Sequence, residues 1–350
     1  MNIIKPGFVI EERDELRGGL KIIESAGRTC YKSEDKATDT SAEGFVKGII
    51  RSRHLSVLEH GDMIFEIGDY HIQDNVIAAM DALHLAGLKP PMLTMTRIGS
   101  RCLISGNIRA WLELFASGSI AARYFIGFFD PIYITGMGFE DADAEPDSRI
   151  RQIRYADIHD PLEQRAHVRQ TVRFTIDRGI SHEFVRHRVM SFSQESTRYC
   201  NYSQGKFGRE ITVIAPCYLV EGSQPYELWR RSCMSDEVEY FTLLNMGLSP
   251  QEARAVLPNS TKTELMMTGT IRQWDHFFDL RARQLTGPAH PQAVEVAEPL
   301  MQEMVERWPE AFIGEFQFSQ ADRRFSQGLS LRMDQQGSSC PGLPNKGEYE

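Results

Sequence analysis

A basic cluster in the middle of the chain carries residue types that could do chemistry. Residues 178–199 read RGISHEFVRHRVMSFSQESTRY, in which Arg186, His187 and Arg188 are consecutive. Ser, Thr and Gln side chains then supply hydroxyl and amide groups between 191 and 197. Guanidinium groups bind phosphate oxygens in bidentate geometry, and consecutive backbone N–H groups in a turn form an anion nest. The cluster therefore predicts a phosphate site.

Two other interpretations of this cluster are an exposed, salt-bridged helix end and a nucleic-acid surface. The chain carries 39 Lys and Arg against 48 Asp and Glu, and this net charge of −9 disfavours a general affinity for nucleic acid or anionic lipid. Aromatic stacking platforms beside the arginines are also few. No P-loop and no G-x-G-x-x-G motif occurs, so a bound dinucleotide would not be held by a Rossmann turn.

Signals for membranes, disulfides and metals are lacking. No window reaches the roughly 18 uninterrupted apolar residues of a membrane span, and the first residues do not resemble a signal peptide. The six cysteines lie far apart without a C-x-x-C pair. The acidic run at 140–147 does not continue into a calcium loop and is typical of a solvated loop. We expect a cytoplasmic chain with no membrane partner and no metal site.

The elements that must position the cluster are read from hydrophobic periodicity. A period of two at Val172, Phe174 and Ile176, and less regularly at 63–67, predicts half-buried strands. Helical spacing predicts helices at 41–53 with Ser41 as the cap, at 107–115, after Ser249-Pro250, and at 270–283. Strands in the middle and helices late in the chain indicate an α+β fold, with an antiparallel sheet flanked by helices and no doubly wound sheet.

Local signals also give an expected start for the helix that carries part of the cluster. Gly179 suits the end of an element, and Ser181 can cap a short helix with Glu183 and Arg186 on one side. Few large apolar residues follow about Gly328. We predict a single domain over 1–327 with an insert at about 70–165, and a flexible tail over 328–350.

The spacing within the cluster resembles a known family. Arg186-His187-Arg188, seven residues and then Ser196 is similar to the R-H-R-x7-S signature of flavin-dependent thymidylate synthases. Five further segments resemble phrases of that family in the family's order: RTCY at 28–31, HLSVLEH at 54–60, SGNIRAW at 105–111, EARAVLP at 252–258 and FDLRA at 278–282. Together the matches cover roughly residues 20–310.

The resemblance implies a homotetramer of α+β subunits in which FAD and dUMP meet where subunits join. The implied reaction is reductive methylation of dUMP to dTMP. Methylenetetrahydrofolate supplies the carbon, NADPH reduces the flavin, and the reduced flavin supplies the hydride. A site built from the Arg186 and Arg281 segments of different subunits would make a monomer inactive.

The resemblance also assigns residues to the ligands. The expected FAD contacts are Ser56, Glu59, Arg186, His187, Arg188, Gln194, Thr270, Arg272 and His276, with His290 near the isoalloxazine side. The expected nucleotide contacts are Glu183, Arg186, Gln194, Ser196, Thr197, Arg198, Arg254 and Arg281. Arg281 matches the catalytic, activating position, where a fixed guanidinium beside N3 and O4 of uracil stabilises charge as C5 attacks. Family members commonly carry Gln, Asn and Asn where this chain has Glu183, Thr270 and His276.

Alternative roles and functions remain open. Ser196 lacks a recognisable paired base, so we expect phosphate or sugar contact in preference to a nucleophile. Cys217 follows Pro216, as the nucleophile does in flavin-independent thymidylate synthases, but a structural role is expected. One rival function is another flavin-assisted pyrimidine modification, such as hydroxymethylation. The other is a catalytically silent nucleotide- or RNA-binding protein. Trp111, Trp274 and Trp308 are expected in the core.

Overall fold

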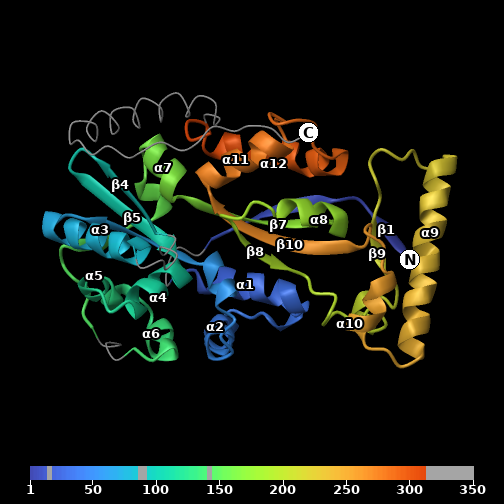
Figure 1. The fold of residues 1–350 in the computed structure, drawn as a ribbon, viewed down its shortest axis with the longest axis horizontal. Helices are drawn as coiled ribbons and strands as arrows, with labels where there is room; N and C mark the ends of the chain where they lie inside the picture. Colours follow the sequence, from blue (N-terminus) through green and yellow to red (C-terminus); the bar gives the residue numbers. More distant parts are fainter. Residues whose placement is uncertain (14–17, 86–92, 140–143, 313–350) are drawn as a thin grey trace, which may run out of the picture. The chain divides into compact units, whose positions relative to one another are not determined.

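The computed structural model describes residues 1–13, 18–85, 93–139 and 144–312 (Figure 1). The strands are β1 (Asn2–Ile4), β2 (Gly7–Glu11), β3 (Asp62–Ile67), β4 (Leu93–Ile98), β5 (Arg101–Asn107), β6 (Ile150–Gln152), β7 (Arg169–Asp177), β8 (Ser191–Gln194), β9 (Thr212–Ile214) and β10 (Lys262–Thr270). The α-helices are α1 (Leu20–Tyr31), α2 (Ser41–Arg51), α3 (Tyr70–Leu85), α4 (Ile108–Ala116), α5 (Ile120–Arg123), α6 (Pro131–Met137), α7 (Pro161–His167), α8 (Arg178–Phe184), α9 (Gln224–Asn245), α10 (Pro250–Ala253), α11 (Ile271–Arg281) and α12 (Pro291–Arg307). Short 3-10 helices are η1 (Glu34–Lys36), η2 (Leu55–His60), η3 (Ile126–Phe128), η4 (Tyr155–Asp157), η5 (Gly205–Phe207) and η6 (Arg254–Val256).

The first antiparallel sheet has the order β2-β7-β10-β8. Val172, Phe174 and Ile176 of β7 are buried in a core shared with α11 and α12, which confirms the period-two prediction. On β10, Leu265 joins the same core whereas the next residue, Met266, joins the core of α1 and α2. Figure 1 shows α11 and α12 on one side of this sheet and α1 on the other. Helices therefore flank the sheet, as predicted.

A second antiparallel sheet, β4-β5-β3-β6, is built mainly from the segment expected as an insert. The prediction of a strand at 63–67 is confirmed by β3, but the expectation that it is half-buried is wrong. Met63 and Phe65 face the core of α1, α2 and α4, whereas Ile64 packs into the core around β7. Both faces of β3 are covered because it lies between the two cores.

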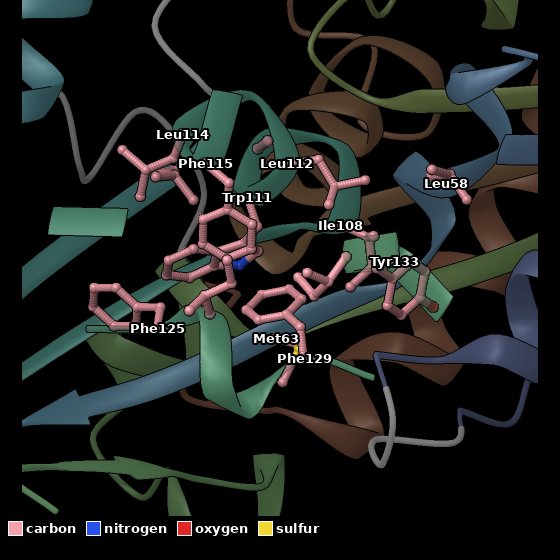
Figure 2. Packing of buried hydrophobic residues seen from close by; sticks show 14 of the residues in the cluster. Leu58, Met63, Ile108, Trp111, Leu112, Leu114, Phe115, Phe125, Phe129 and Tyr133 are labelled. Carbon is pink, nitrogen blue, oxygen red and sulfur yellow. The ribbon is translucent and has the colours of Figure 1, made fainter. Parts of the chain in front are cut away.

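The core of the second sheet centres on aromatic side chains (Figure 2). Trp111 of α4 is fully buried, and its ring centroid lies 4.9 Å from that of Phe125 and 5.7 Å from that of Phe129. Its indole N–H donates to the Gly106 carbonyl at 3.1 Å, so the one polar atom of the ring is satisfied. The predicted core positions of Trp111 and Trp274 are confirmed, and Trp308 packs partly buried against the other core.

The α+β class is confirmed, and the predicted helices are present with shifted boundaries. Thr40 occupies the cap position of α2, so Ser41 begins the helix instead of capping it. Ser249 and Glu252 form a capping box at α10, as the Ser-Pro signal predicts. Among the described helices, none combines the length and apolar character that crossing a membrane requires.

The domain boundaries stay predictions. Residues Met1–Phe312 form one unit. The predicted tail at 328–350 lies outside the described residues, as do residues 140–143 of the acidic run.

Candidate active site

The junction between β7 and α8 sets the position of the basic cluster. Asp177 ends the strand in an extended conformation, and its Oδ1 accepts from the Ile180 N–H at 2.8 Å, which caps α8. Its Oδ2 accepts from Gln292 Nε2 of α12 at 2.8 Å. Burial raises the pKa of Asp177. The cap ties α8 to α12 at the end of the central strand.

The expectation that Ser181 caps this helix is wrong. Asp177 begins α8 four residues earlier, so Ser181 lies within the helix. Its hydroxyl donates to the Arg178 carbonyl at 2.8 Å and accepts from Gln194 Nε2 at the same distance. The Asp177 carboxylate accepts one of the otherwise unpaired N–H groups of the first turn, so the helix starts there. Ser181 instead connects α8 to the end of β8.

Arg281, the last residue of α11, lies at the centre of the candidate site. Its Nη1 donates to Glu183 Oε2 at 2.6 Å and its Nη2 to the Glu183 carbonyl at 3.1 Å. Its Nε donates to His187 Nε2 at 3.4 Å. Three donors of one planar group are therefore directed at α8 and the turn after it. This fixes the guanidinium plane.

His187 is buried, although both of its arginine neighbours are exposed. Burial, and then the charges of Arg281 and His276, lower the pKa of His187 to about 4. The imidazole is thus neutral near pH 7 and can accept the Arg281 N–H. Its ring packs edge-on against Phe277, with centroids 4.9 Å apart, and lies 5.8 Å from the His276 ring.

Arg186 and Arg188 point to solvent from a tight turn. The Arg188 N–H donates to the Arg186 carbonyl at 2.9 Å, and Gln273 of α11 donates to the Val189 carbonyl at 2.9 Å. The triplet is therefore split into one inward imidazole and two outward guanidinium groups. This arrangement suits an anionic ligand that lies over the turn.

The Ser196 segment follows β8, but its backbone does not form the expected open anion nest. The N–H groups of Tyr199 and Cys200 donate to the Ser196 carbonyl at 3.1 and 3.0 Å, and that of Arg198 to the Ser196 hydroxyl at 3.3 Å. The Ser196 N–H donates to the Cys30 carbonyl of α1 at 3.1 Å, so four N–H groups of this segment are already engaged. Anion binding here would depend on side chains.

Those side chains come from two segments that meet. Arg254 of η6 donates to the Thr197 hydroxyl at 3.3 Å, and the Arg198 guanidinium lies over the Tyr199 ring, 5.6 Å from its centroid. The described partner of the Ser196 hydroxyl is an N–H group, and no imidazole or carboxylate among the described residues bonds to it. The geometry favours ligand contact over nucleophilic attack for Ser196.

Sequence reasoning missed Glu195, which is 2% exposed between Gln194 and Ser196. Its Oε2 accepts from Lys262 Nζ at 2.9 Å, and Lys262 and Lys32 both pair with Glu264. Burial alone would raise the pKa of Glu264, but the two lysines lower it to about 2. A cavity of about 630 Å³ lies beside this network. In the sequence, only the charged residues Lys262 and Glu264 at the start of β10 could have indicated this ion-pair network.

The segment with Ser56 and Glu59 lies in η2, and it is anchored by the next residue. His60 is fully buried between the Thr268 and Ser193 hydroxyls, at 2.7 and 3.0 Å. Burial, and then the charge of Arg13, lower its pKa to about 3. Ser56 is exposed and Glu59 is half-buried.

On α11, the expected FAD contacts occupy different environments. Thr270 caps the helix in a reciprocal box with Gln273, so its hydroxyl already accepts a backbone N–H at 3.3 Å. Arg272 is exposed, and His276 is half-buried beside His187. His290 caps α12 and packs against Tyr218, 5.7 Å away between ring centroids.

The structure brings Glu183, His187, His276 and Arg281 together, and separately Thr197 with Arg254. Gln194 is linked to the first group through Ser181 of α8. Among the described residues, no hydrogen bond or ion pair joins Ser56 or Glu59 to Arg281. Arg281 reaches Glu183 and His187 within one chain. The expected site between the Arg186 and Arg281 segments of different subunits stays a prediction.

Cys217 is exposed on the loop after β9. Burial of the sulfur, and then Glu295, raise the pKa of the thiol. A thiol with a raised pKa is a poor nucleophile near neutral pH. A nucleophilic role for Cys217 therefore gains no support, and the expected structural role stays a prediction.

The sequence profile of the family described as "Thymidylate synthase complementing protein" matches residues 14–72 and 136–310. That is most of the chain. The chain belongs to this family. Residues 73–135, which include β4 and β5 of the second sheet and the helices α4 and α5, lie outside the match.

Two relatives named flavin-dependent thymidylate synthase are about one-third identical to this chain over the aligned residues. The protein from Pyrococcus furiosus is 31% identical over 140 residues, 39% of this chain and 55% of the relative. That from Corynebacterium glutamicum is 32% identical over 141 residues, 36% of this chain and 54% of the relative. The chain therefore spans about half the length of these relatives.

Among solved structures, the chain is similar to a UMP/dUMP methylase, PolB, from Streptomyces cacaoi bound with 5-Br dUMP. The identity is 16%, the TM-score is 0.39, and the match covers 89% of this chain and 95% of that chain.

Proposed function

We propose that the chain is an enzyme that converts dUMP to dTMP by reductive methylation, with methylenetetrahydrofolate as carbon donor and NADPH as reductant. Family membership supports the reaction class. The observation that carries the proposal is the guanidinium of Arg281, which Glu183 and His187 hold in one orientation. A fixed cation suits activation of C5, because the electron-rich form of the uracil ring from which C5 attacks carries negative charge on N3 and O4.

His187 helps Arg281 because it is neutral. An imidazolium there would repel the guanidinium and compete for the same developing charge. Because its pKa is lowered to about 4, His187 is neutral and accepts a hydrogen bond from Arg281 Nε. The Nη1 and Nη2 groups of Arg281 donate to Glu183. The chain thus supplies orientation and charge, and no activated Cys or Ser is needed.

The donor set fits FAD. Arg186 and Arg188 present exposed guanidinium groups that suit a pyrophosphate, and Glu59 presents a carboxylate that suits a hydroxyl or N–H donor. When bound, FAD supplies the hydride chemistry. We assign FAD contacts to Ser56, Glu59, Arg186, His187, Arg188, Gln194, Thr270, Arg272 and His276.

The nucleotide is assigned to the neighbouring polar groups. Arg198, Arg254 and the Ser196 hydroxyl provide side-chain partners for the 5′-phosphate. We assign dUMP contacts to Glu183, Arg186, Gln194, Ser196, Thr197, Arg198, Arg254 and Arg281. The proposal includes a homotetramer with sites at subunit interfaces, a single domain over 1–327 with an insert at about 70–165, and a cytoplasmic location.

The first test is to record the visible spectrum of the purified chain and to assay it anaerobically. NADPH, methylenetetrahydrofolate and dUMP are supplied, with UMP in a parallel reaction, and 5-substituted products are identified by mass. Flavin absorbance with folate-dependent dTMP formation is the expected result. A bound flavin with a hydroxymethylated product would replace methylation by another pyrimidine modification. A colourless protein that takes up no added FAD would contradict the enzyme assignment and leave nucleotide or RNA binding.

A further inference from the structure

Arg109 contacts Glu59 from the part of the chain that the family profile does not match. Arg109 Nη1 lies 2.8 Å from Glu59 Oε1, and its Nε lies 2.9 Å from Glu113 Oε1. Burial alone would lower the pKa of Arg109, but the carboxylates of Glu59 and Glu113 raise it. The guanidinium is therefore a permanent cation held between two carboxylates.

The backbone that carries Arg109 is fixed to the backbone that carries Glu59. Asn107 pairs with Asp62 across β5 and β3, and its side chain caps α4 by accepting from the Ala110 N–H at 2.8 Å. The Ile108 N–H donates to the Gly61 carbonyl at 3.0 Å. The start of α4 and the end of η2 therefore move as one piece.

One oxygen of Glu59 is left for a ligand. Oε1 accepts from Arg109, whereas no described residue donates to Oε2, and the Glu59 side chain keeps 22% of its surface exposed. A carboxylate accepts from hydroxyl and N–H groups and repels phosphate. Its ligand group must therefore be a donor, such as a sugar hydroxyl or a base N–H.

We propose that Arg109 is a positioning residue that orients the Glu59 carboxylate toward a hydroxyl or N–H donor of FAD. This inference rests on the proposed function, because Glu59 is assigned to FAD there. Arg109 acts by removing rotamers of Glu59 in which Oε2 would turn away from the ligand. It gives the segment outside the family match a part in cofactor binding.

The test is FAD affinity, measured by titrating the FAD-free chain and following flavin fluorescence. Arg109→Gln is expected to weaken FAD binding about tenfold. Glu113→Gln is the matched control, because it removes the other carboxylate partner of Arg109 and leaves Glu59 held; its affinity should stay within about twofold. The FAD-free melting temperature should change by no more than about 2 °C in both variants, because partly exposed ion pairs contribute little stability.

A double-mutant cycle separates positioning from a general structural role. In a Glu59→Gln background, Arg109→Gln should weaken FAD binding no further, and Arg109→Lys should restore part of the affinity in the parent background. Unchanged FAD affinity in Arg109→Gln, or an equal loss with Gln at position 59, would overturn this inference alone. A parent chain that binds no FAD would overturn the proposed function and the inference with it.

Discussion

At the residue scale, Arg281 differs from the other arginines of the site in the number of directions from which it is held. Arg186 and Arg188 extend into solvent, whereas Arg281 donates to a carboxylate, a carbonyl and an imidazole. Because the Arg281 side chain is already fixed, ligand binding does not have to pay the entropy of ordering it. Arg281 can therefore stabilise charge in a transition state more effectively than a mobile arginine.

We predict that Arg281→Ala lowers the rate of dTMP formation about 10²- to 10³-fold, as expected for the loss of one fixed donor to a developing anion. Arg281→Lys should recover only part of this rate, because an ammonium group lacks the planar fork of donors with which Arg281 bonds Glu183 and His187. Single-turnover assays with saturating dUMP measure the effect. Arg307→Ala, at the exposed end of α12, is the control with no expected change. A folded Arg281→Ala variant that turns over within twofold of the parent would disprove the catalytic role.

At the element scale, the close approach of two backbones sets the place of η2 against α1. A methyl group on Gly61 would overlap the Gly18 carbonyl oxygen and lie 2.6 Å from Ile23 Cδ1. Gly61 has a φ of −87°, so the requirement comes from space and not from backbone conformation. The residue before it, His60, anchors the same segment to β8 and β10.

We predict that Gly61→Ala lowers the free energy of unfolding by about 1–3 kcal/mol, since a backbone oxygen cannot move aside as a side chain can. Gly48→Ala on α2 is the matched control, because a methyl group there meets no atom within 4 Å. It should be neutral or stabilising by up to about 1 kcal/mol, as alanine favours helix over glycine. Urea unfolding of both variants measures the difference. Equal stabilities would show that η2 shifts away from α1 without cost.

The elements themselves were largely predictable from local pattern, whereas their edges and partners were not. Val172, Phe174 and Ile176 signal β7 because one face of that strand is apolar. Ser181 was a misleading cap signal, because the buried Asp177 competes for the same helix start. The strands β4 and β5 were not predicted, since Cys102, Leu103 and Ile104 of β5 form a continuous apolar run without a period of two.

The site was predictable only as a set of residues. Motif order named Arg281 and Glu183, but their contact joins positions 98 apart in the sequence, and only the packing of α11 against α8 decides it. Glu195 had no local signal, and the SGNIRAW segment gave Arg109 no role in the site, because the role of each depends on a partner from another element. Periodicity describes faces of elements, and it does not describe which faces meet.

At the scale of the whole molecule, neutral histidines join distant parts of the chain. His60 bridges η2 to β8 and β10, and its bond to Thr268 spans 208 residues. His167 bonds to Thr96 and Ser105 at 2.7 Å each, which joins the end of α7 to β4 and β5. Burial lowers the pKa of His60 to about 3. Burial, and then the charge of Arg169, lower the pKa of His167 to about 4.

These pKa shifts predict an acid-sensitive fold. Below the ordinary histidine pKa of 6.5, the unfolded chain binds protons that the folded chain does not, so stability is full above pH 6.5 and falls as pH drops toward 4. Each histidine contributes a slope of up to about 1.4 kcal/mol per pH unit in this window. Urea unfolding at several pH values measures the slope. His167→Gln should lower the slope of unfolding free energy against pH by the contribution of one histidine. His71→Gln, at an exposed position, should leave this slope unchanged. A parent whose stability is constant across this window would contradict the neutral, buried state.

The last prediction concerns how subunits complete the site. Arg281 and Arg254 belong to separate groups. Val189, Tyr199 and Leu285 are each more than half exposed, and a second subunit could cover such side chains. In the proposed homotetramer, we predict that each site takes Arg281 from one subunit and Arg254 from another. Arg281→Ala and Arg254→Ala tetramers should each be nearly inactive. Random mixed tetramers of the two should recover roughly a quarter of parental activity, because that share of sites joins two intact arginines. Light scattering first establishes the tetramer, and differential tags isolate the mixed one. No recovery in verified mixed tetramers would mean that both arginines act from one chain, since every chain would then carry a defect.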